Sequence, residues 1–363
     1  MQLNHRTKRL FKYLQCSFDA ACLLFSGNRD FIRINGTRYG QLMACSDAQA
    51  MLGTKSVVFY DEPVANKFAV KKWSEVFRVN QGAWLLWRLS EKLGWPKIRV
   101  EKLTEENGFS HFRPSESKAF IEFSEEEKSR GWCALRKKGI RPTDNIVCVH
   151  TRDESYMERW QPESDHSFRA VRNTDSDVLI KSIEYLVGNG FKVIRIGSEA
   201  EKRIPIERDG FWDYAIDDHD EFMDLFLLSV CRCLIATCAG VTIAAMAFRK
   251  PCLLFDHFPI FTEIFNSKER IFIPKKIYSG KRALSWSEMI DVRGRDPDII
   301  PTEEDLARQG LRLKGVSPDE LLKFVRVFVN DSDLCPAVRM LPNGKGGKIA
   351  VLEQFIKDNP ELL

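Results

Sequence analysis

A turn of small residues between an apolar run and a helical pattern is the part of the chain best suited to bind an anion. The run 234–236 predicts a strand, the stretch 241–248 predicts a helix, and the apolar run 252–255 predicts the next strand. The first turn of a helix presents backbone N–H groups without partners in the helix, and these groups favour phosphates. A compact turn without a ligand fits this stretch equally well. The binding interpretation assigns contacts with a phosphate or pyrophosphate to Thr237, Cys238, Ala239, Gly240 and Thr242.

A second candidate site follows the apolar stretch 146–150, IVCVH, which predicts a strand buried on both faces. In open α/β sheets, ligands bind beyond the carboxyl ends of the strands, where His150 and Arg152 would lie. An arginine there can donate two hydrogen bonds to a pyrophosphate, and His150 is a candidate catalytic residue. Two structural alternatives stay open. Arg152 could pair with Asp153, and His150 could be a half-buried structural histidine.

The polar segment 151–175 contains four arginines between positions 152 and 172. Long loops inside a compact domain are often functional, so we expect this segment to close over an anionic ligand rather than to be a solvated connection. The next predicted strand, 191–197, ends at a glycine, which lets the backbone approach a ligand or simply makes a turn. The candidate ligand contacts in these two regions are Tyr156, Arg172, Asn173, Gly197 and Ser198.

The first half of the chain offers a candidate acceptor side. The stretch 36–42, GTRYGQL, predicts a glycine turn after a strand, with Gly40 and Gln41 facing a cleft. Asp61 follows the predicted strand 56–60 and is the best-placed carboxylate to act as a base toward an acceptor hydroxyl. The acidic cluster 217–220 is better explained by Asp220 capping the next helix than by a metal, and no metal site is expected.

Composition limits the class of protein. The chain has 363 residues, 44% hydrophobic and 29% charged, with a net charge of +4. This balance argues against nucleic acid and allows an anionic ligand or an acidic membrane surface. No run of 18 apolar residues occurs, and most of the ten cysteines lie in apolar runs, as buried thiols in a reducing cytoplasm would. The first 25 residues predict an amphipathic helix that packs on the core, rather than a secretory signal or a helix on a membrane surface.

Helical and strand patterns alternate along the chain, which predicts an α/β fold with parallel sheets. We expect two Rossmann-like lobes, 1–140 and 141–335, followed by a C-terminal tail, 336–363, in which the Gly/Lys-rich stretch 342–348 is mobile. No GxGxxG, GxxxxGK[ST], GxSxG or HExxH motif is present, which argues against a simple dinucleotide oxidoreductase. The expected strands are 30–35, 56–60, 98–103, 146–150 and 191–197, and the expected helices are 41–51, 85–94, 124–138, 176–190, 220–231 and 317–329.

Several of these segments together resemble a known family. The stretches 150–156, 172–175, 183–198, 220–240 and 251–256 resemble bacterial glycosyltransferases of GT-B architecture from surface-polysaccharide synthesis. A fainter resemblance is to fucosyltransferases with a His-x-Arg motif. The resemblance implies a cleft between two Rossmann-like lobes, a nucleotide sugar in the C-terminal lobe, and no metal or other cofactor. It also implies that Arg152 and the turn 237–240 hold the pyrophosphate.

The resemblance predicts a glycosyltransferase of hexosyl or fucosyl type that moves a sugar from a nucleotide-diphosphate donor to a glycan or lipid-linked acceptor. Such an enzyme would be cytoplasmic, in peripheral contact with the inner membrane. The chain departs from the family at Gly40-Gln41-Leu42, where relatives carry Gly-His-Leu, and its phosphate turn has fewer serines. Two alternatives therefore stay open: a nucleotide-sugar epimerase or hydrolase of the same architecture, and a non-catalytic sugar-nucleotide-binding protein.

Overall fold

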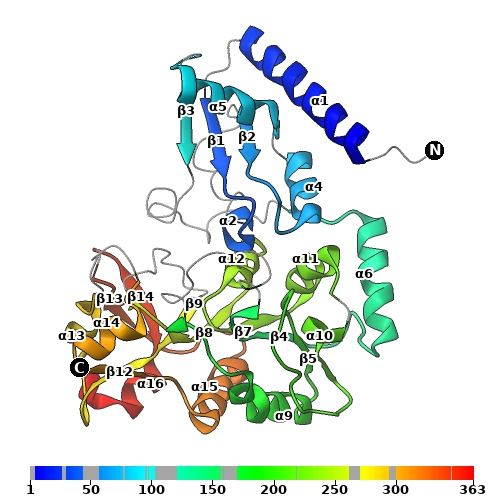
Figure 1. Ribbon diagram of the computed structural model, residues 1–363. Coiled ribbons are helices and arrows are strands. Elements are labelled where there is room, and N and C mark those ends of the chain that lie inside the picture. Colours follow the sequence, from blue (N-terminus) through cyan, green and yellow to red (C-terminus); the bar gives the residue numbers. More distant parts are fainter. Residues whose placement is uncertain are drawn as a thin grey trace. The chain divides into compact units, whose positions relative to one another are not determined.

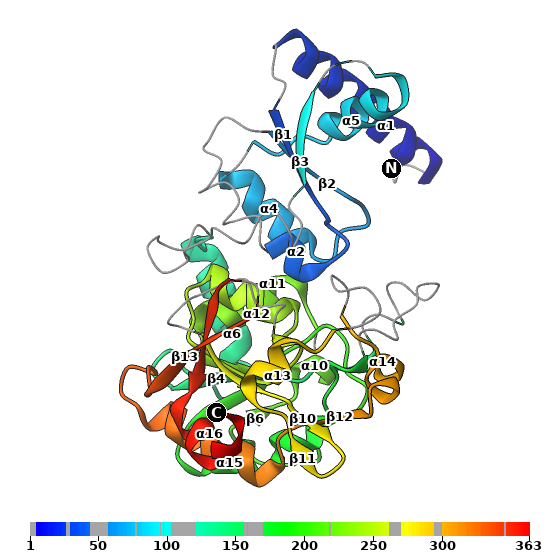
Figure 2. The same cartoon turned by 90° about the vertical axis from the view of Figure 1, so that its left-hand side faces the viewer.

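The chain folds into two compact units, each built of helices around a largely parallel sheet (Figures 1 and 2). Among the described residues, the first unit ends at Glu122 and the second begins at Phe123. This arrangement confirms the predicted α/β class with two Rossmann-like lobes, whereas the cleft stays a prediction. The computed structural model describes residues 5–26, 30–43, 57–76, 78–94, 96, 98–102, 121–155, 158, 170–217, 219–260, 270–293, 300–344 and 346–363.

The first unit contains a three-stranded parallel sheet in the order β2-β1-β3. Phe31 of the central strand pairs with Val57 on one side and with Val100 on the other. The last helix of the unit ends at Gly94, whose φ of 65° is left-handed, as the sequence predicts. The elements are α1 (His5–Phe25), β1 (Asp30–Ile34), α2 (Tyr39–Met43), β2 (Val57–Tyr60), α4 (Lys67–Val76), α5 (Gly82–Leu93) and β3 (Arg99–Lys102).

Helix α1 packs on the core of the first unit through its C-terminal half. Ala20 and Leu23 belong to a buried cluster with Phe59 and Trp87. A side chain at Gly82 of α5 would collide with the backbone of Ala20, so the two helices touch without intervening side chains. The predicted core-packed amphipathic helix is confirmed for this half. In the part of the chain that the structure describes, no helix combines the length and the apolar character needed to cross a bilayer.

The second unit contains an eight-stranded sheet in the order β13-β14-β9-β8-β7-β4-β5-β6 (Figure 1). Every neighbouring pair is parallel except β13 and β14. From β4, the strands β5 and β6 follow one another toward one edge of the sheet. From β7, the strands β8 and β9 follow one another toward the other edge. The strands are β4 (Ile146–His150), β5 (Lys192–Arg195), β6 (Phe211–Trp212), β7 (Cys233–Ala236), β8 (Cys252–His257), β9 (Arg270–Pro274), β13 (Val338–Pro342) and β14 (Lys348–Leu352).

Three helices of this unit begin at the caps that the sequence predicts. Ser124 and Ser317 form capping boxes with Glu127 and Glu320, and the carboxylate of Asp220 accepts the N–H groups of two residues in the next helix. The helices are α6 (Glu125–Lys137), η2 (Ser176–Leu179), α9 (Ile180–Gly188), α10 (Tyr214–Asp217), α11 (Glu221–Val230), α12 (Gly240–Ala247), α13 (Trp286–Ile290), α14 (Glu303–Arg308), α15 (Pro318–Asn330), α16 (Glu353–Asp358) and η4 (Pro360–Leu362).

Helix α6 belongs to the second unit, so the two units separate before residue 125 and not at the predicted position 140. The physical reason is its contact with α11, where Gly131 faces the ring of Phe226 without space for a side chain. Trp132 packs edge-on against the same ring, with 5.7 Å between the ring centroids.

The segment 336–363 is an integral part of the second unit and not a tail. Strand β14 pairs in parallel with β9 at Val351 and Phe272, and β13 pairs with β14 in a hairpin. The four residues 349–352 are buried, which anchors the segment in the core. The Gly/Lys-rich stretch that suggested a mobile tail contains the hairpin turn. A further small sheet holds β10 (Lys276–Ser279), β11 (Arg282–Ala283) and β12 (Leu311–Lys314).

Candidate functional site

The order of strands in the larger sheet identifies a switch point between β4 and β7. Chain connections leave these two strands in opposite directions, and in open α/β sheets this is the position at which ligands bind, beyond the carboxyl ends of the strands. His150 of β4 pairs with Ala236 of β7, so both strands end at the same level. The two motifs that the sequence singles out, the end of IVCVH and the turn after 236, therefore lie side by side.

Hydrogen bonds join these two strand ends directly. The backbone N–H of Arg152 donates to Oγ1 of Thr237 over 2.8 Å, and the N–H of Thr237 donates to the carbonyl of His150 over 3.2 Å. Thr237 is fully buried. This threonine therefore fixes where the chain carrying Arg152 leaves the sheet.

The small-residue turn leads into α12 without a side-chain cap. Ala239 is the N-cap residue and offers no oxygen to the N–H groups of Gly240 and Val241. The hydroxyl of Thr242 donates back to the carbonyl of Ala239 over 2.8 Å and does not cap the helix either. Cys238, Ala239 and Gly240 are half-buried. An anion at this position would receive the N–H groups that a cap normally binds.

The segment 170–175 brings Arg172 and Asn173 to the same turn. Nη2 of Arg172 donates to the carbonyl of Cys238 over 3.0 Å, and Nδ2 of Asn173 donates to Glu154 over 3.1 Å. Nε of Arg172 and Oδ1 of Asn173 are buried, and neither has a hydrogen-bond partner among the described residues. Buried polar atoms normally have partners, so these two atoms are candidates for contacts with a ligand.

Two buried charges that the sequence analysis missed hold this segment in place. Nζ of Lys275 donates to the carbonyls of Val171 and Asn173 over 3.0 and 2.8 Å. Oδ2 of Asp256 accepts the hydroxyl of Thr174 over 2.9 Å. Burial raises the pKa of Asp256 and lowers that of Lys275, and in both cases the charge of the other residue opposes the shift. Asp256 is the second-last residue of the apolar strand β8, so the carboxyl-end rule that identifies His150 could also have found it.

Cys238 contacts a second buried histidine at the end of β8. Its Sγ lies 3.0 Å from Nδ1 of His257, which is 1% exposed. Burial, Arg172 and Arg270 lower the pKa of His257 to about 3. The imidazole is therefore neutral at neutral pH and adds no charge to the turn.

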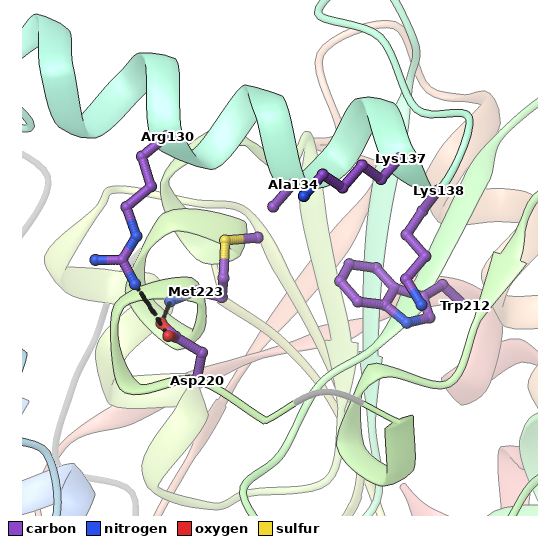
Figure 3. Close-up of a pocket in the computed structure, with 7 residues that line it drawn as sticks. All are labelled: Arg130, Ala134, Lys137, Lys138, Trp212, Asp220 and Met223. Carbon is purple, nitrogen blue, oxygen red and sulfur yellow. Dashed lines mark hydrogen bonds and ion pairs between the residues drawn. The ribbon is translucent and has the colours of Figure 1, made fainter.

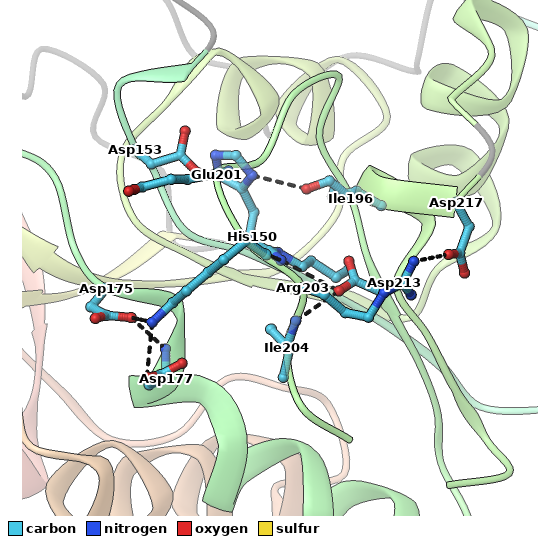
Figure 4. A network of polar contacts seen from close by, with 12 residues as sticks. His150, Asp153, Asp175, Asp177, Ile196, Glu201, Arg203, Ile204, Asp213 and Asp217 are labelled. Carbon is cyan, nitrogen blue, oxygen red and sulfur yellow. Dashed lines mark hydrogen bonds and ion pairs between the residues drawn. The ribbon is translucent and has the colours of Figure 1, made fainter. Parts of the chain in front are cut away.

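His150 also lies in the site as a neutral imidazole. Burial, opposed by its hydrogen bond to Ile196, lowers the pKa of His150 to about 4. Its Nδ1 lies 2.9 Å from the carbonyl of Ile196 and donates to it, as Figure 4 shows. Nδ1 therefore carries the proton and Nε2 is an acceptor. The next residue, Gly197, has a φ of 149°, a backbone conformation that other residues rarely adopt.

Polar contacts connect the loops at the carboxyl ends of β4 and β5 (Figure 4). The carboxylate of Asp153 accepts the N–H groups of Ser155 and Glu201 over 3.2 and 3.1 Å. Lys202 pairs with Asp175 at 2.8 Å and with Asp177 at 2.9 Å. These contacts tie the loop that begins at Gly197 and Ser198 to both ends of the segment 151–175.

The first unit places its candidates differently from the sequence analysis. Both carboxylate oxygens of Asp61 accept hydrogen bonds from Arg33, at 3.2 and 3.0 Å, so the carboxylate is engaged in an ion pair. Gly40 and Gln41 lie in α2 and not in a turn, which is formed at Asn35–Arg38 instead. Tyr156 lies outside the described residues. The functional roles assigned to all these residues stay predictions.

The described residues contain no group of three or more His, Cys, Asp or Glu side chains that could hold a metal ion. Their cysteines are free thiols, and those at positions 148, 231, 233 and 252 are buried.

Comparison with known proteins yields similarities to solved structures only. No family model and no curated protein matches the chain. The structure of E. coli ADP-heptose LPS heptosyltransferase II is 12% identical, with a TM-score of 0.45 over 81% of this chain and 96% of that chain. A glycosyl transferase family 9 protein from Veillonella parvula is 11% identical, with a TM-score of 0.37 over 64% of this chain and 66% of that one.

A third similarity is to the dodecameric iron-containing heptosyltransferase TibC, whose structure contains ADP-D-β-D-heptose. That protein, described from enterotoxigenic E. coli, is 10% identical, with a TM-score of 0.36 over 67% of this chain and 62% of its own. At this level of similarity, function has to be argued from the site itself. The fainter resemblance to fucosyltransferases has no counterpart among these structures and stays a prediction.

Proposed function

We propose that the protein is a glycosyltransferase that moves a sugar from a nucleotide-diphosphate donor to a glycan or lipid-linked acceptor. One observation carries the proposal. At the switch point of the larger sheet, the uncapped N-terminus of α12 meets Arg172, whose buried Nε has no acceptor among the described residues. Donors that converge at the carboxyl ends of parallel strands suit the diphosphate of a bound nucleotide.

The chemistry follows from where charge develops. When the bond between the sugar and the diphosphate breaks, negative charge accumulates on the leaving phosphate. The N–H groups of Gly240 and Val241 and the guanidinium groups of Arg152 and Arg172 would stabilise that charge without moving. Because these cations already belong to the chain, we propose that the transfer needs no metal. His150 is neutral, and its Nε2 is an acceptor. It can accept a hydrogen bond from the bound nucleotide sugar, but Nε2 carries no proton that it could donate.

The acceptor hydroxyl also needs a base, and we propose Asp61 for this role. Its ion pair with Arg33 at 3.0 Å positions the carboxylate, and each oxygen accepts one of the two hydrogen bonds. Each oxygen keeps a further lone pair that can accept a hydrogen bond from the acceptor hydroxyl. If Asp61→Asn leaves turnover unchanged, the base is another residue. We further propose that the acceptor belongs to surface-polysaccharide synthesis and that the protein acts at the cytoplasmic face of the membrane.

The first experiment is a thermal-shift screen with UDP, GDP, CMP, dTDP and ADP, with and without magnesium. A ligand that binds the folded state raises the unfolding temperature by mass action. We expect a shift with one nucleotide that does not need metal and is lost in Arg152→Ala and Arg172→Ala. The matched control is Arg326→Ala, because Arg326 is an exposed arginine stacked on Tyr185, 4.6 Å from its ring centroid. Absence of any shift contradicts the donor site.

Turnover measurements then distinguish the three hypotheses for the function of the site. A transferase releases the nucleoside diphosphate faster when acceptor is present. An epimerase or hydrolase converts the nucleotide sugar without acceptor, and a binding protein shows affinity with no conversion. Binding without conversion would mean that Gln41, at the position where relatives carry histidine, marks a loss of activity.

A further inference from the structure

A cavity of the second unit lies beside α6 and shares no residue with the site at the switch point (Figure 3). It has a volume of 520 Å³ and is lined by α6, the edge strand β6 and the first turn of α11. Sites for small molecules have volumes of roughly 300–1,000 Å³, so this cavity is large enough for one.

The rim of the cavity carries an excess of positive charge. Arg130, Lys137 and Lys138 reach it from α6, and all three are exposed. Asp220 is the carboxylate that lines it, and both of its oxygens accept from Nη2 of Arg130, at 3.3 and 3.0 Å. Arg130 is therefore neutralised. Lys137 makes no ion pair with any carboxylate that the structure describes, and its charge faces the cavity without a counter-ion.

The floor of the cavity is apolar and contains an unsatisfied donor. Trp212 is 8% exposed and Met223 is 6% exposed, and Ala134 of α6 also lines the cavity, above Met223 in Figure 3. Nε1 of Trp212 is buried without an acceptor among the described residues, although a buried indole N–H normally has one. Nζ of Lys138 lies 5.0 Å from the centroid of the indole ring.

We propose that this cavity binds a small organic anion, a phosphate or carboxylate attached to a ring or a short apolar body. The anionic group lies beside Lys137, within reach of Lys138, and supplies the counter-charge that Lys137 lacks. The ring or apolar body lies against Ala134 and Met223. The exposed side chain of Lys138 moves aside, so that an oxygen of the ligand accepts the N–H of Trp212. This inference does not depend on the proposed glycosyltransferase activity.

A simpler explanation for the lysines is available and must be tested. Lys137 lies in the last turn of α6, where a cation stabilises the partial negative charge of the helix end. The same explanation applies to Lys138, the C-cap residue of α6, but it does not account for the cavity, the apolar floor or the unsatisfied indole. It predicts that no ligand binds.

The test follows the indole N–H signal of Trp212 by NMR in the full ¹⁵N-labelled chain, with Trp212→Phe used to assign it. The probes are glucose 6-phosphate, inorganic phosphate and glucose. We expect a saturable shift with glucose 6-phosphate, a weaker effect of inorganic phosphate and none of glucose. Lys137→Gln should weaken binding roughly tenfold, the loss expected for one hydrogen bond to a charged group. The control Lys128→Gln changes another lysine of α6, one that pairs with Glu125 at 2.7 Å and lies outside the cavity.

Two results overturn the proposal. The first is an indole signal that none of the anions moves. The second is an equal loss of affinity in Lys137→Gln and Lys128→Gln, which would mean that the surface attracts anions without a site. Calorimetric titration of the same variants checks the stoichiometry, and one anion per chain is expected. All of these outcomes can be read whether or not nucleotides bind at the switch point.

Discussion

A side chain at Gly315 would occupy the space that the carboxylate of Asp256 fills, because a Cβ atom there would lie 2.5 Å from Oδ2 and 2.9 Å from Oδ1. Asp256 accepts the N–H of Val316 over 2.8 Å and the hydroxyl of Thr174 over 2.9 Å. A glycine in the loop before α15 thus allows Asp256 to hold the segment that carries Arg172. Gly315 therefore affects the candidate site indirectly, through Asp256 and Thr174, without contacting Arg172.

Gly315→Ala should therefore lower both stability and nucleotide affinity. Displacing a buried carboxylate from two hydrogen bonds costs about 2 kcal/mol of unfolding free energy, the usual scale for overpacking. Urea denaturation and nucleotide titration measure the two effects. The control is Gly188→Ala in α9, where the nearest atoms lie 3.9 Å away and alanine gains up to about 1 kcal/mol of helix propensity. Equal stability of the two variants would show that Asp256 tolerates displacement.

Gly131→Ala should separate stability from binding. A methyl group there would collide with the ring of Phe226, which forces α6 away from α11. We expect a loss of about 1–3 kcal/mol of unfolding free energy, measured by urea denaturation. Nucleotide affinity should stay unchanged in the folded fraction, because this contact lies outside the candidate site. A loss of affinity at full folding would mean that the packing of α6 reaches the switch point.

Much of the candidate site is readable from the sequence because parallel strands share a direction. Once 146–150 and 234–236 are recognised as neighbouring strands, their carboxyl ends must meet, and Arg152 and Thr237 must approach each other. The caps at Ser124, Asp220 and Ser317 are equally local, since each depends on residues within three positions. These features follow from rules that need no knowledge of the tertiary fold.

The supporting contacts could not be predicted in the same way. Lys275 reaches carbonyls more than 100 positions away in the sequence, and Asp256 reaches Thr174 over 82 positions. Local propensity says nothing about such pairs. The C-terminal hairpin was missed for another reason: its Gly/Lys-rich turn dominates the composition, whereas the short buried strand 348–352 carries the structural information. Asp61 could have been paired with Arg33, because both lie at the ends of adjacent parallel strands.

Thr237→Val should test whether the bridge between β4 and β7 supports the site. Valine keeps the shape and removes the acceptor for the N–H of Arg152, which leaves a half-buried donor unsatisfied. We expect a loss of about 1–3 kcal/mol of unfolding free energy, together with weaker nucleotide binding. Thr237→Ser retains the hydroxyl and is the matched control. If valine and serine bind nucleotide equally well, the hydrogen bond is structural only.

The pH dependence of stability should report the buried state of His150. Its pKa is lowered to about 4 in the folded chain, against an ordinary value of 6.5. Between these pH values the unfolded chain binds a proton that the folded chain does not, so the unfolding free energy falls as the pH falls. The slope for one such group is at most about 1.4 kcal/mol per pH unit. His257 contributes in the same direction, because its pKa is lowered to about 3.

His150→Gln should flatten that dependence, since glutamine keeps an N–H donor for the carbonyl of Ile196 but does not titrate. Urea denaturation of both proteins from about pH 7 to about pH 5 measures the difference in slope. His219 acts in the opposite direction, because Asp224 raises its pKa and its stabilising contribution is lost as the pH rises. The quantity to compare is therefore the difference in unfolding free energy between the two proteins at each pH. The contributions of His219 and His257 are the same in both proteins and cancel in this difference. Parallel stability curves would mean that His150 takes up its proton in the folded chain at its ordinary pKa.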